Sequence, residues 1–268
     1  MSELTEPKEY LAEVVALSRV AGNKILEVYD SEFSVENKAD NSPLTAADMA
    51  AHHAIVDGLA KISPEIPVLS EESTQIPYSE RKTWSRYWLV DPLDGTREFI
   101  KRNGEFTVNI ALIDGDRPSL GVVHVPVTGV TYAAARGDGA RRSGADKVLH
   151  PIGVRKLGDG PLGVVGSRSH RGDSLNAYLE RLGEHEMVGM GSSLKLCLVA
   201  EGIADIYPRL GLTSEWDTAA AHCVVEEAGG FVTRLDLKPL LYNTKDSLLN
   251  PFFFVFGDDS RDWSQYLD

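Results

Sequence analysis

From residue 162 onward, short apolar runs of strand length alternate with helical segments, and few folds accommodate that order. Turns rich in glycine, aspartate and proline separate the segments. The expected strands span 162–166, 187–190, 204–207, 231–235 and 252–256, and the expected helices span 174–182, 192–201 and 218–228. Alternation of this kind predicts a layered α/β arrangement.

The first half has a different order, with two helices ahead of a run of strands. Apolar residues recur at helical spacing through 8–30, and a second helix is expected over 45–61. Strands are expected at 66–69, 87–90, 107–113, 121–127 and 129–135, which predicts two helices on a largely antiparallel sheet.

The chain as a whole is therefore expected to combine α+β and α/β character. Glycine-rich stretches at 137–144 and 158–163 suggest a boundary near 140–160. We expect an N-terminal α+β half, 1–150, and a C-terminal α/β half, 151–268.

Composition excludes several classes of protein. Lys and Arg number 27 and Asp and Glu 40, and the net charge of −13 argues against a protein that wraps nucleic acid. No apolar run approaches the roughly 18 residues of a membrane span, and the acidic N-terminus does not resemble a signal peptide. Cys197 and Cys223 are too few for a disulfide framework and are expected as buried thiols. We expect a cytoplasmic protein; peripheral attachment to the inner face of the cell membrane and the oligomeric state stay open.

The segment D-P-L-D-G-T at 91–96 follows an expected buried strand, at the edge where ligand sites of α/β sheets lie. Asp91 and Asp94 can face one point, with the Leu93 carbonyl between them. Such a hard oxygen set suits Mg²⁺ better than zinc. The backbone N–H groups that follow can seat a phosphate at a helix start. A plain aspartate-rich turn would have the same composition.

Further acidic residues lie near the ends of other expected elements. Glu71 and Glu72 follow the strand before this segment, and Asp217 precedes the last expected helix. Asp48 ends a T-x-x-D sequence near the start of the second helix. Asp217 could simply be an N-cap and Asp48 part of a capping box.

In combination, these acidic segments resemble those of the inositol monophosphatase superfamily of Mg²⁺-dependent, lithium-sensitive phosphatases. A Glu after one strand, D-P-L-D-G-T after the next and W-D-T-A-A near the end occur in family order, over about 10–260. The branch that the chain resembles most is the 3'(2'),5'-bisphosphate nucleotidases of the CysQ type. Its marks here are V-V-G-S-R-S-H at 164–170, G-S-S-L-K at 191–195 with A-E-G-I-A-D-I-Y-P-R at 200–209, and E-W-D-T-A-A at 215–220.

The resemblance implies the family's α-β-α-β-α sandwich and a site for two or three Mg²⁺ ions. Glu71, Asp91 and the Leu93 carbonyl would hold a first ion. Asp91, Asp94 and Asp217 would hold a second, and Glu71 would contribute to a third, weaker one. Divalent ions would neutralise carboxylates that otherwise raise one another's pKa.

The resemblance also implies catalytic roles for Asp48, Thr96 and Glu71. Thr96 would hold and help deprotonate the attacking water, and Asp48 would accept the threonine proton. Glu72 is expected to point away from the ligands and to act indirectly at most.

Nucleotide selection would fall to His170, Ser192, Lys195 and Arg209. Lys195 and Arg209 suit a second phosphate, which an inositol phosphate lacks. The alternatives are an exposed helix lysine, a surface ion pair of the arginine and a solvated loop histidine. The remaining substrate-binding residues would be Glu71, Leu93, Asp94, Gly95, Thr96 and Asp217.

The resemblance thus predicts a phosphatase of sulfur metabolism that converts adenosine 3',5'-bisphosphate to AMP, with 3'-phosphoadenylyl sulfate as a further candidate substrate. The expected partner is this small nucleotide bisphosphate and not a nucleic acid. One rival is an inositol-1-monophosphatase or broad sugar phosphatase with the same metal site. Another is a catalytically silent relative that binds RNA or protein, which the intact acidic residues argue against.

Overall fold

The computed structural model describes residues 5–31, 43–73, 75–144, 146–166 and 172–267. Two long helices, α1 (Pro7–Tyr29) and α2 (Pro43–Ile62), lie where the apolar spacing predicts them. His170, an expected nucleotide-selecting residue, lies outside the described residues.

The first sheet has seven strands that follow the chain order, and only its first pair is parallel. Short connecting elements flank β2: the 3₁₀ turn η1 (Glu71–Ser73) and the helices α3 (Tyr78–Arg81) and α4 (Thr96–Ile100). The strands are β1 (Val68–Ser70), β2 (Arg86–Asp94), β3 (Thr107–Asp114), β4 (Arg117–His124), β5 (Thr131–Ala135), β6 (Gly139–Ser143) and β7 (Leu149–Pro151).

The second sheet has five strands in the order β11-β12-β10-β8-β9. β8 pairs in parallel with β9 and β10, whereas β12 runs antiparallel to β10 and β11. The elements are β8 (Leu162–Gly166), α5 (Asp173–Leu182), β9 (His185–Gly189), α6 (Leu194–Ala200), β10 (Ile206–Arg209), α7 (Ala219–Glu227), β11 (Phe231–Arg234), β12 (Phe253–Phe256) and the 3₁₀ turn η2 (Trp263–Tyr266).

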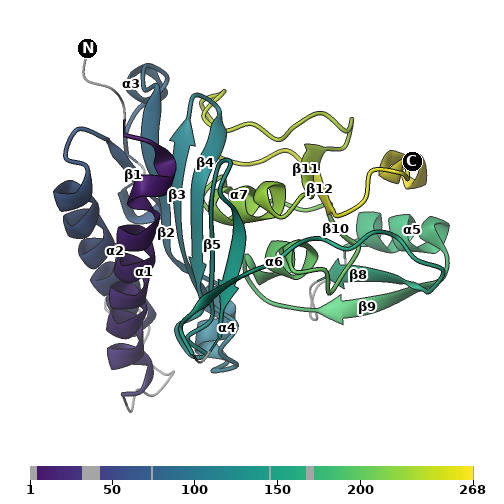
Figure 1. The fold of residues 1–268 in the computed structure, drawn as a ribbon, viewed down its shortest axis with the longest axis horizontal. Coiled ribbons are helices and arrows are strands. Elements are labelled where there is room, and N and C mark those ends of the chain that lie inside the picture. The colour runs from purple at the N-terminus through teal and green to yellow at the C-terminus, as the bar shows by residue number, and fades with distance from the viewer. Residues whose placement is uncertain (1–4, 32–42, 74, 145, 167–171, 268) are drawn as a thin grey trace.

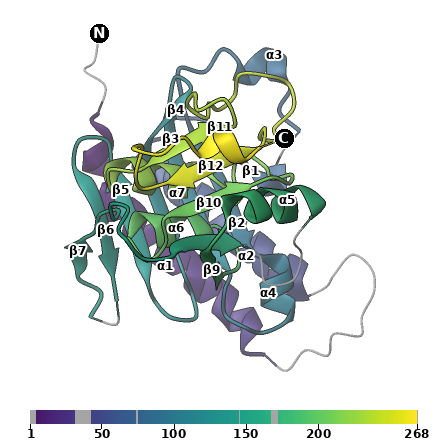
Figure 2. The same ribbon diagram turned by 90° about the vertical axis from the view of Figure 1, so that its right-hand side faces the viewer.

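Helical and sheet layers alternate through the molecule (Figures 1 and 2). α1 and α2 cover the outer face of the first sheet, and α6 and α7 lie between the two sheets. α5 and η2 pack together on the far face of the second sheet. This is the α-β-α-β-α sandwich expected from the sequence, so that prediction is confirmed.

Helices on both faces explain why the central strands are apolar throughout. On β2, Trp88 and Val90 pack in the core beneath α1 and α2, while Tyr87 and Leu89 pack in the core around α6 and α7. Successive strand residues point to opposite faces, so a sheet that is covered on both faces needs apolar side chains at every position.

The glycine-rich stretch 137–144, which suggested a boundary near 140–160, contains a strand that the sequence did not indicate. Gly139–Ser143 forms β6, and β7 extends the sheet to Pro151. Gly137 and Gly139 have φ of 78° and 75° and form the turn of the β5–β6 hairpin. The two sheets change over between β7 and β8, and the division into halves at 150 stays a prediction.

Gly121 on β4 allows α7 to approach the first sheet closely. A Cβ atom at this position would lie 2.1 Å from the carbonyl oxygen of Ala220, and α7 begins two residues after Asp217. We expect Gly121→Ala to lower the free energy of unfolding by about 3 kcal/mol, because the helix backbone must move away from the sheet. Urea denaturation measures this change.

The matched control is Gly158→Ala, because a Cβ at Gly158 has no neighbour within 4 Å. Its effect should stay within about 0.5 kcal/mol. Equal losses in the two variants would contradict the close contact at Gly121.

Candidate active site

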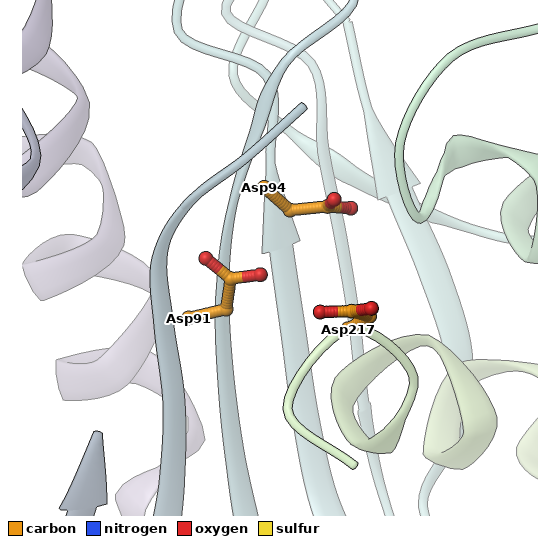
Figure 3. Close-up of side chains that lie close together, drawn as sticks. All are labelled: Asp91, Asp94 and Asp217. Carbon is orange, nitrogen blue, oxygen red and sulfur yellow. The ribbon is translucent and has the colours of Figure 1, made fainter. Parts of the chain in front are cut away.

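Three aspartates from two distant parts of the chain lie together. Asp91, Asp94 and Asp217 each place a carboxylate oxygen within 4.8 Å of the others. Asp91 and Asp94 belong to the end of β2, and Asp217 belongs to the turn before α7. Figure 3 shows the three carboxylates pointing toward a common space.

A register shift in the β2–β3 pairing sets the direction of the Asp91 and Asp94 side chains. Asp91 pairs with Asn109 and Asp94 with Thr107, so β2 has two residues between these pairs where β3 has one. A bulge of this kind bends a strand and re-aims its side chains. Without it, residues three apart on a strand would point to opposite faces.

Backbone N–H groups fix two of the carboxylates. The N–H of Ser193 donates to Asp94 Oδ2 at 2.5 Å, and the N–H of Ser214 donates to Asp217 Oδ2 at 2.9 Å. Thr218 is the N-cap of α7. The N-cap interpretation of Asp217 is therefore wrong, because its side chain bonds back to the preceding turn.

Glu71, Asp48 and Glu72 extend the acidic cluster. Glu71 and Asp91 lie close enough to affect each other's pKa. Asp48 is not in a capping box, since α2 already begins at Pro43. Asp48 is buried, with Oδ1 unpartnered among the described residues. Glu72, which the sequence suggested would point away from the ligands, lies close enough to Asp48 to add to the rise in pKa that burial causes.

Burial and nearby carboxylates raise the pKa of five carboxyl groups in this cluster, those of Asp48, Glu71, Asp91, Asp94 and Asp217. Burial is the larger cause, and it raises the pKa of Asp217 to about 7 and that of Asp48 to about 8, with neighbouring carboxylates adding to both. The pKa values of Glu71, Asp91 and Asp94 are raised for the same reasons. Buried carboxylates at such close range need cations to ionise together. The all-oxygen donor set fits a hard divalent ion.

A polar pocket adjoins Asp94 and Asp217. It is lined by Gly95, Arg97, Glu98, Met190, Gly191, Ser192, Ser193, Lys195, Leu196, Tyr207, Arg209, Thr213, Thr218 and Phe253 as well as the two aspartates. Ser192, Lys195 and Arg209 thus lie around one pocket beside the acidic cluster.

Two cationic side chains of this pocket, Lys195 and Arg209, are not plain surface groups. Lys195 is half-buried, and its Nζ donates to the Ser192 carbonyl at 2.6 Å. Burial, helped by Arg209, lowers the pKa of Lys195, while Asp94 acts in the opposite direction. The guanidinium of Arg209 donates to the Leu212 carbonyl at 2.6 Å, and its buried Nε has no partner among the residues described.

Gly95 and Thr96 connect β2 to α4. Gly95 has a φ of 96°, which a residue with a side chain rarely adopts, and Thr96 is the exposed first residue of α4. Both Asp48 and Thr96 are described, and no hydrogen bond joins their side chains. Their expected pairing stays a prediction.

Sequence reasoning missed the residues that support Asp94. Ser193 lies within the G-S-S-L-K segment, but nothing in that segment indicates a contact with a strand about 100 residues earlier. Thr107 and Asn109 lie in an otherwise apolar strand, and their polarity there was the available signal.

The comparisons with known proteins agree with this geometry. Residues 6–255 match the family model described as the inositol monophosphatase family. The chain belongs to this family. It is 53% identical to the 3'(2'),5'-bisphosphate nucleotidases CysQ of Shigella flexneri and Escherichia coli (strain K12), over 91% of this chain and 98% of each relative. The suspected resemblance is confirmed.

Solved structures of the family share the fold. The crystal structure of CysQ from Bacteroides thetaiotaomicron has a TM-score of 0.82 at 42% identity and covers 92% of this chain and 97% of that one. An inositol monophosphatase from Zymomonas mobilis has a TM-score of 0.80 at 23% identity and covers 98% and 99%.

Two further observations concern the metal and the membrane. The family is metal-dependent, and this chain supplies an acidic cluster that could bind metal. Among the helices described, none combines the length and apolar character of a membrane span. Cys197 and Cys223 are buried free thiols, as the sequence predicts.

Metal-free protein should lose stability as the pH rises, because Asp217 must ionise against its neighbours. Its pKa is raised from 3.8 to about 7, so the folded state binds more protons than the unfolded state between these values. Asp217→Asn removes this penalty. We expect the variant to melt at a higher temperature than the wild type at pH 8 with chelator, with a smaller difference at pH 5.

Mg²⁺ should reverse the order of the two proteins at pH 8. The wild type gains stability from ion binding, whereas the variant lacks a ligand. Differential scanning fluorimetry with and without Mg²⁺ measures both effects, and the exposed Asp259→Asn is the control. Parallel pH curves for wild type and Asp217→Asn would rule out the electrostatic account.

Proposed function

We propose that this chain is a Mg²⁺-dependent phosphatase that removes the 3'-phosphate of adenosine 3',5'-bisphosphate, giving AMP and phosphate. The observation that carries the proposal is the 53% identity to CysQ bisphosphate nucleotidases along nearly their whole length. The acidic cluster beside a pocket that Arg97, Lys195 and Arg209 line supports it. 3'-Phosphoadenylyl sulfate is a further candidate substrate.

The proposed ion ligands are Glu71, Asp91, Asp94, Asp217 and the Leu93 carbonyl, for two or three Mg²⁺ ions. Support comes from the close approach of Asp91, Asp94 and Asp217 and from the raised pKa values of these groups and of Glu71. When bound, Mg²⁺ would offset the negative charge of the site and of a phosphate and would lower the pKa of water.

The proposed catalytic residues are Asp48, Thr96 and Glu71. The Thr96 hydroxyl would orient the attacking water, and Asp48 would accept a proton from that hydroxyl. Support comes from Asp48 Oδ1, which is buried without a partner in the described chain and so can accept one. Gly95 allows the sharp turn that places Thr96 directly after the aspartates.

The proposed nucleotide-selecting residues are Ser192, Lys195 and Arg209, with His170 as the expected fourth. Lys195 and Arg209 line the pocket beside the acidic cluster and suit a substrate with a second phosphate. The Ser192 hydroxyl is buried and unpartnered in the described structure, which leaves it free for a ribose or phosphate oxygen. Glu71, Leu93, Asp94, Gly95, Thr96 and Asp217 complete the proposed contacts.

The inositol-1-monophosphatase alternative is not favoured. The Zymomonas mobilis inositol monophosphatase is 23% identical to this chain, whereas the CysQ relatives are 53% identical. The expected cytoplasmic location, any peripheral contact with the inner membrane face and the oligomeric state stay predictions.

Phosphate release in Mg²⁺ tests the proposal directly. Adenosine 3',5'-bisphosphate and inositol 1-phosphate are compared side by side, and kcat/KM should be at least about 100-fold higher for the nucleotide, equivalent to about 2.7 kcal/mol. A preference for the inositol ester would reject the nucleotidase assignment. Absence of any phosphate release would reject the phosphatase assignment.

Lys195→Met should reduce the preference for the nucleotide. The change keeps the apolar stem of the side chain but removes the charge beside Asp94. We expect kcat/KM to fall about 100-fold for the bisphosphate, because a charge-assisted contact to the second phosphate is lost, and less than about tenfold for inositol 1-phosphate. The exposed Lys61→Met is the control. Equal losses on both substrates would assign Lys195 to the metal site instead of the nucleotide.

A further inference from the structure

Three polar side chains are buried where the first sheet meets the start of α6. Thr107 and Asn109 belong to β3 and are 0% and 1% exposed, and Ser193, just before α6, is 2% exposed. They lie at the border of a region otherwise packed with apolar side chains. Buried polar groups are costly unless they are hydrogen-bonded, so their presence needs a reason.

Hydrogen bonds connect the three side chains in one direction. Ser193 Oγ donates to Asn109 Oδ1 at 2.8 Å, and Ser193 Oγ lies 2.9 Å from Thr107 Oγ1. A hydroxyl has one hydrogen to donate, so the hydroxyl of Thr107 must be the donor to Ser193. Thr107 therefore donates to Ser193 and Ser193 donates to Asn109, so the side-chain oxygen of Asn109 faces Ser193.

The hydrogen-bonded side chains lie beside both aspartates of β2. In the β2–β3 register, Thr107 is opposite Asp94 and Asn109 is opposite Asp91. The N–H of Ser193 donates to Asp94 Oδ2 at 2.5 Å. Asn109 Nδ2 is buried and has no hydrogen-bond partner among the described residues. The Asn109 side chain lowers the pKa of Asp94, which burial raises.

Ser193 also belongs to the turn at 192–193, which borders the polar pocket. Ser193 follows Ser192, which has a φ of 44°, and precedes Lys195 by two positions. The Ser192 carbonyl accepts a hydrogen bond from the Lys195 ammonium. Through the Ser193 N–H, the turn at 192–193 is attached to the strand that contains Asp94.

We propose that Ser193, together with Thr107 and Asn109, is a positioning residue that holds Asp94 in the geometry needed to bind a divalent cation. The inference rests on the metal site of the proposed function. It deepens that proposal, because it assigns the support of the site to three side chains that do not bind the ion themselves. Groups that orient metal ligands typically change metal affinity 10- to 100-fold when they are removed.

The test measures Mg²⁺ affinity without substrate. The chelator-treated full chain is titrated with Mg²⁺, and the midpoint of the melting-temperature rise is recorded for each variant. Ser193→Ala should raise this midpoint about tenfold. Its matched control is Ser119→Ala, because Ser119 is equally buried and its hydroxyl bonds to the Leu112 carbonyl at 3.2 Å, away from the acidic cluster.

A second pair of variants keeps the test decisive if Ser193→Ala does not fold. Thr107→Val keeps the shape of the side chain and removes the hydroxyl, and it should also raise the Mg²⁺ midpoint. Thr107→Ser keeps a hydroxyl, so its midpoint should stay near the wild-type value. The control is Thr131→Val, because Thr131 is fully buried on β5 and hydrogen-bonded to His124 at 2.9 Å. Any loss of melting temperature that the controls share reflects stability alone.

Activity provides a separate readout. At saturating Mg²⁺, Ser193→Ala should recover most of its kcat, because the ligands themselves are intact. Equal Mg²⁺ midpoints in Ser193→Ala and Ser119→Ala would overturn this inference while leaving the proposed function standing. A wild-type protein that shows no response to Mg²⁺ would overturn both.

Discussion

Repulsion among buried carboxylates is the constraint on which the site depends. Asp91, Asp94 and Asp217 are close enough to share one ion, and burial raises the pKa of each. A folded chain tolerates this only if rigid elements hold the groups and a cation compensates for them. The strands and helices around the site therefore hold together groups that repel one another, at the expense of stability in the metal-free state.

The layered fold supplies that rigidity from opposite sides. β2 is covered on both faces, so Asp91 and Asp94 extend from one of the most deeply buried strands of the described structure. Asp217 is attached to α7, which packs tightly on β4 through Gly121. Each carboxylate thus belongs to an element with little freedom to move apart, and metal binding need not pay much for ordering the ligands.

Local patterns predicted most elements well, because periodicity and breakers act within a few residues. The strand at 162–166 matches β8, and the acidic segments contain the residues that the structure brings together. The failures have one origin. Asp217 and Asp48 fit local capping patterns, yet Asp217 accepts a hydrogen bond from the Ser214 N–H. The pKa of Asp48 is raised by burial and by Glu72, which only the folded chain brings near. The polar strand β6 has no apolar alternation, so the sequence did not indicate a strand there.

Long-range pairing also explains why the support of Asp94 could not be predicted. Ser193 lies 99 positions after Asp94, and their contact depends on how α6 packs between the two sheets. The sequence contains the hydroxyl and the amide but not their register. Their polarity within an apolar strand is a usable signal only once β3 is known to be covered on both faces.

The distribution of charge over the two sheets suggests how substrate preference can change within one fold. Glu71, Asp91 and Asp94 come from the connections and strands of the first sheet, whereas Lys195 and Arg209 come from α6 and β10 beside the second. The charges of Asp94 and Arg209 act on the pKa of Lys195 in opposite directions. Lys195 moves with α6 and Arg209 with β10, so a displacement of either element would shift one cation relative to the carboxylates of β2. A displacement of α6 would also disturb the metal site, because the N–H of Ser193, directly before α6, donates to Asp94. Substrate preference and metal binding are therefore coupled through this turn.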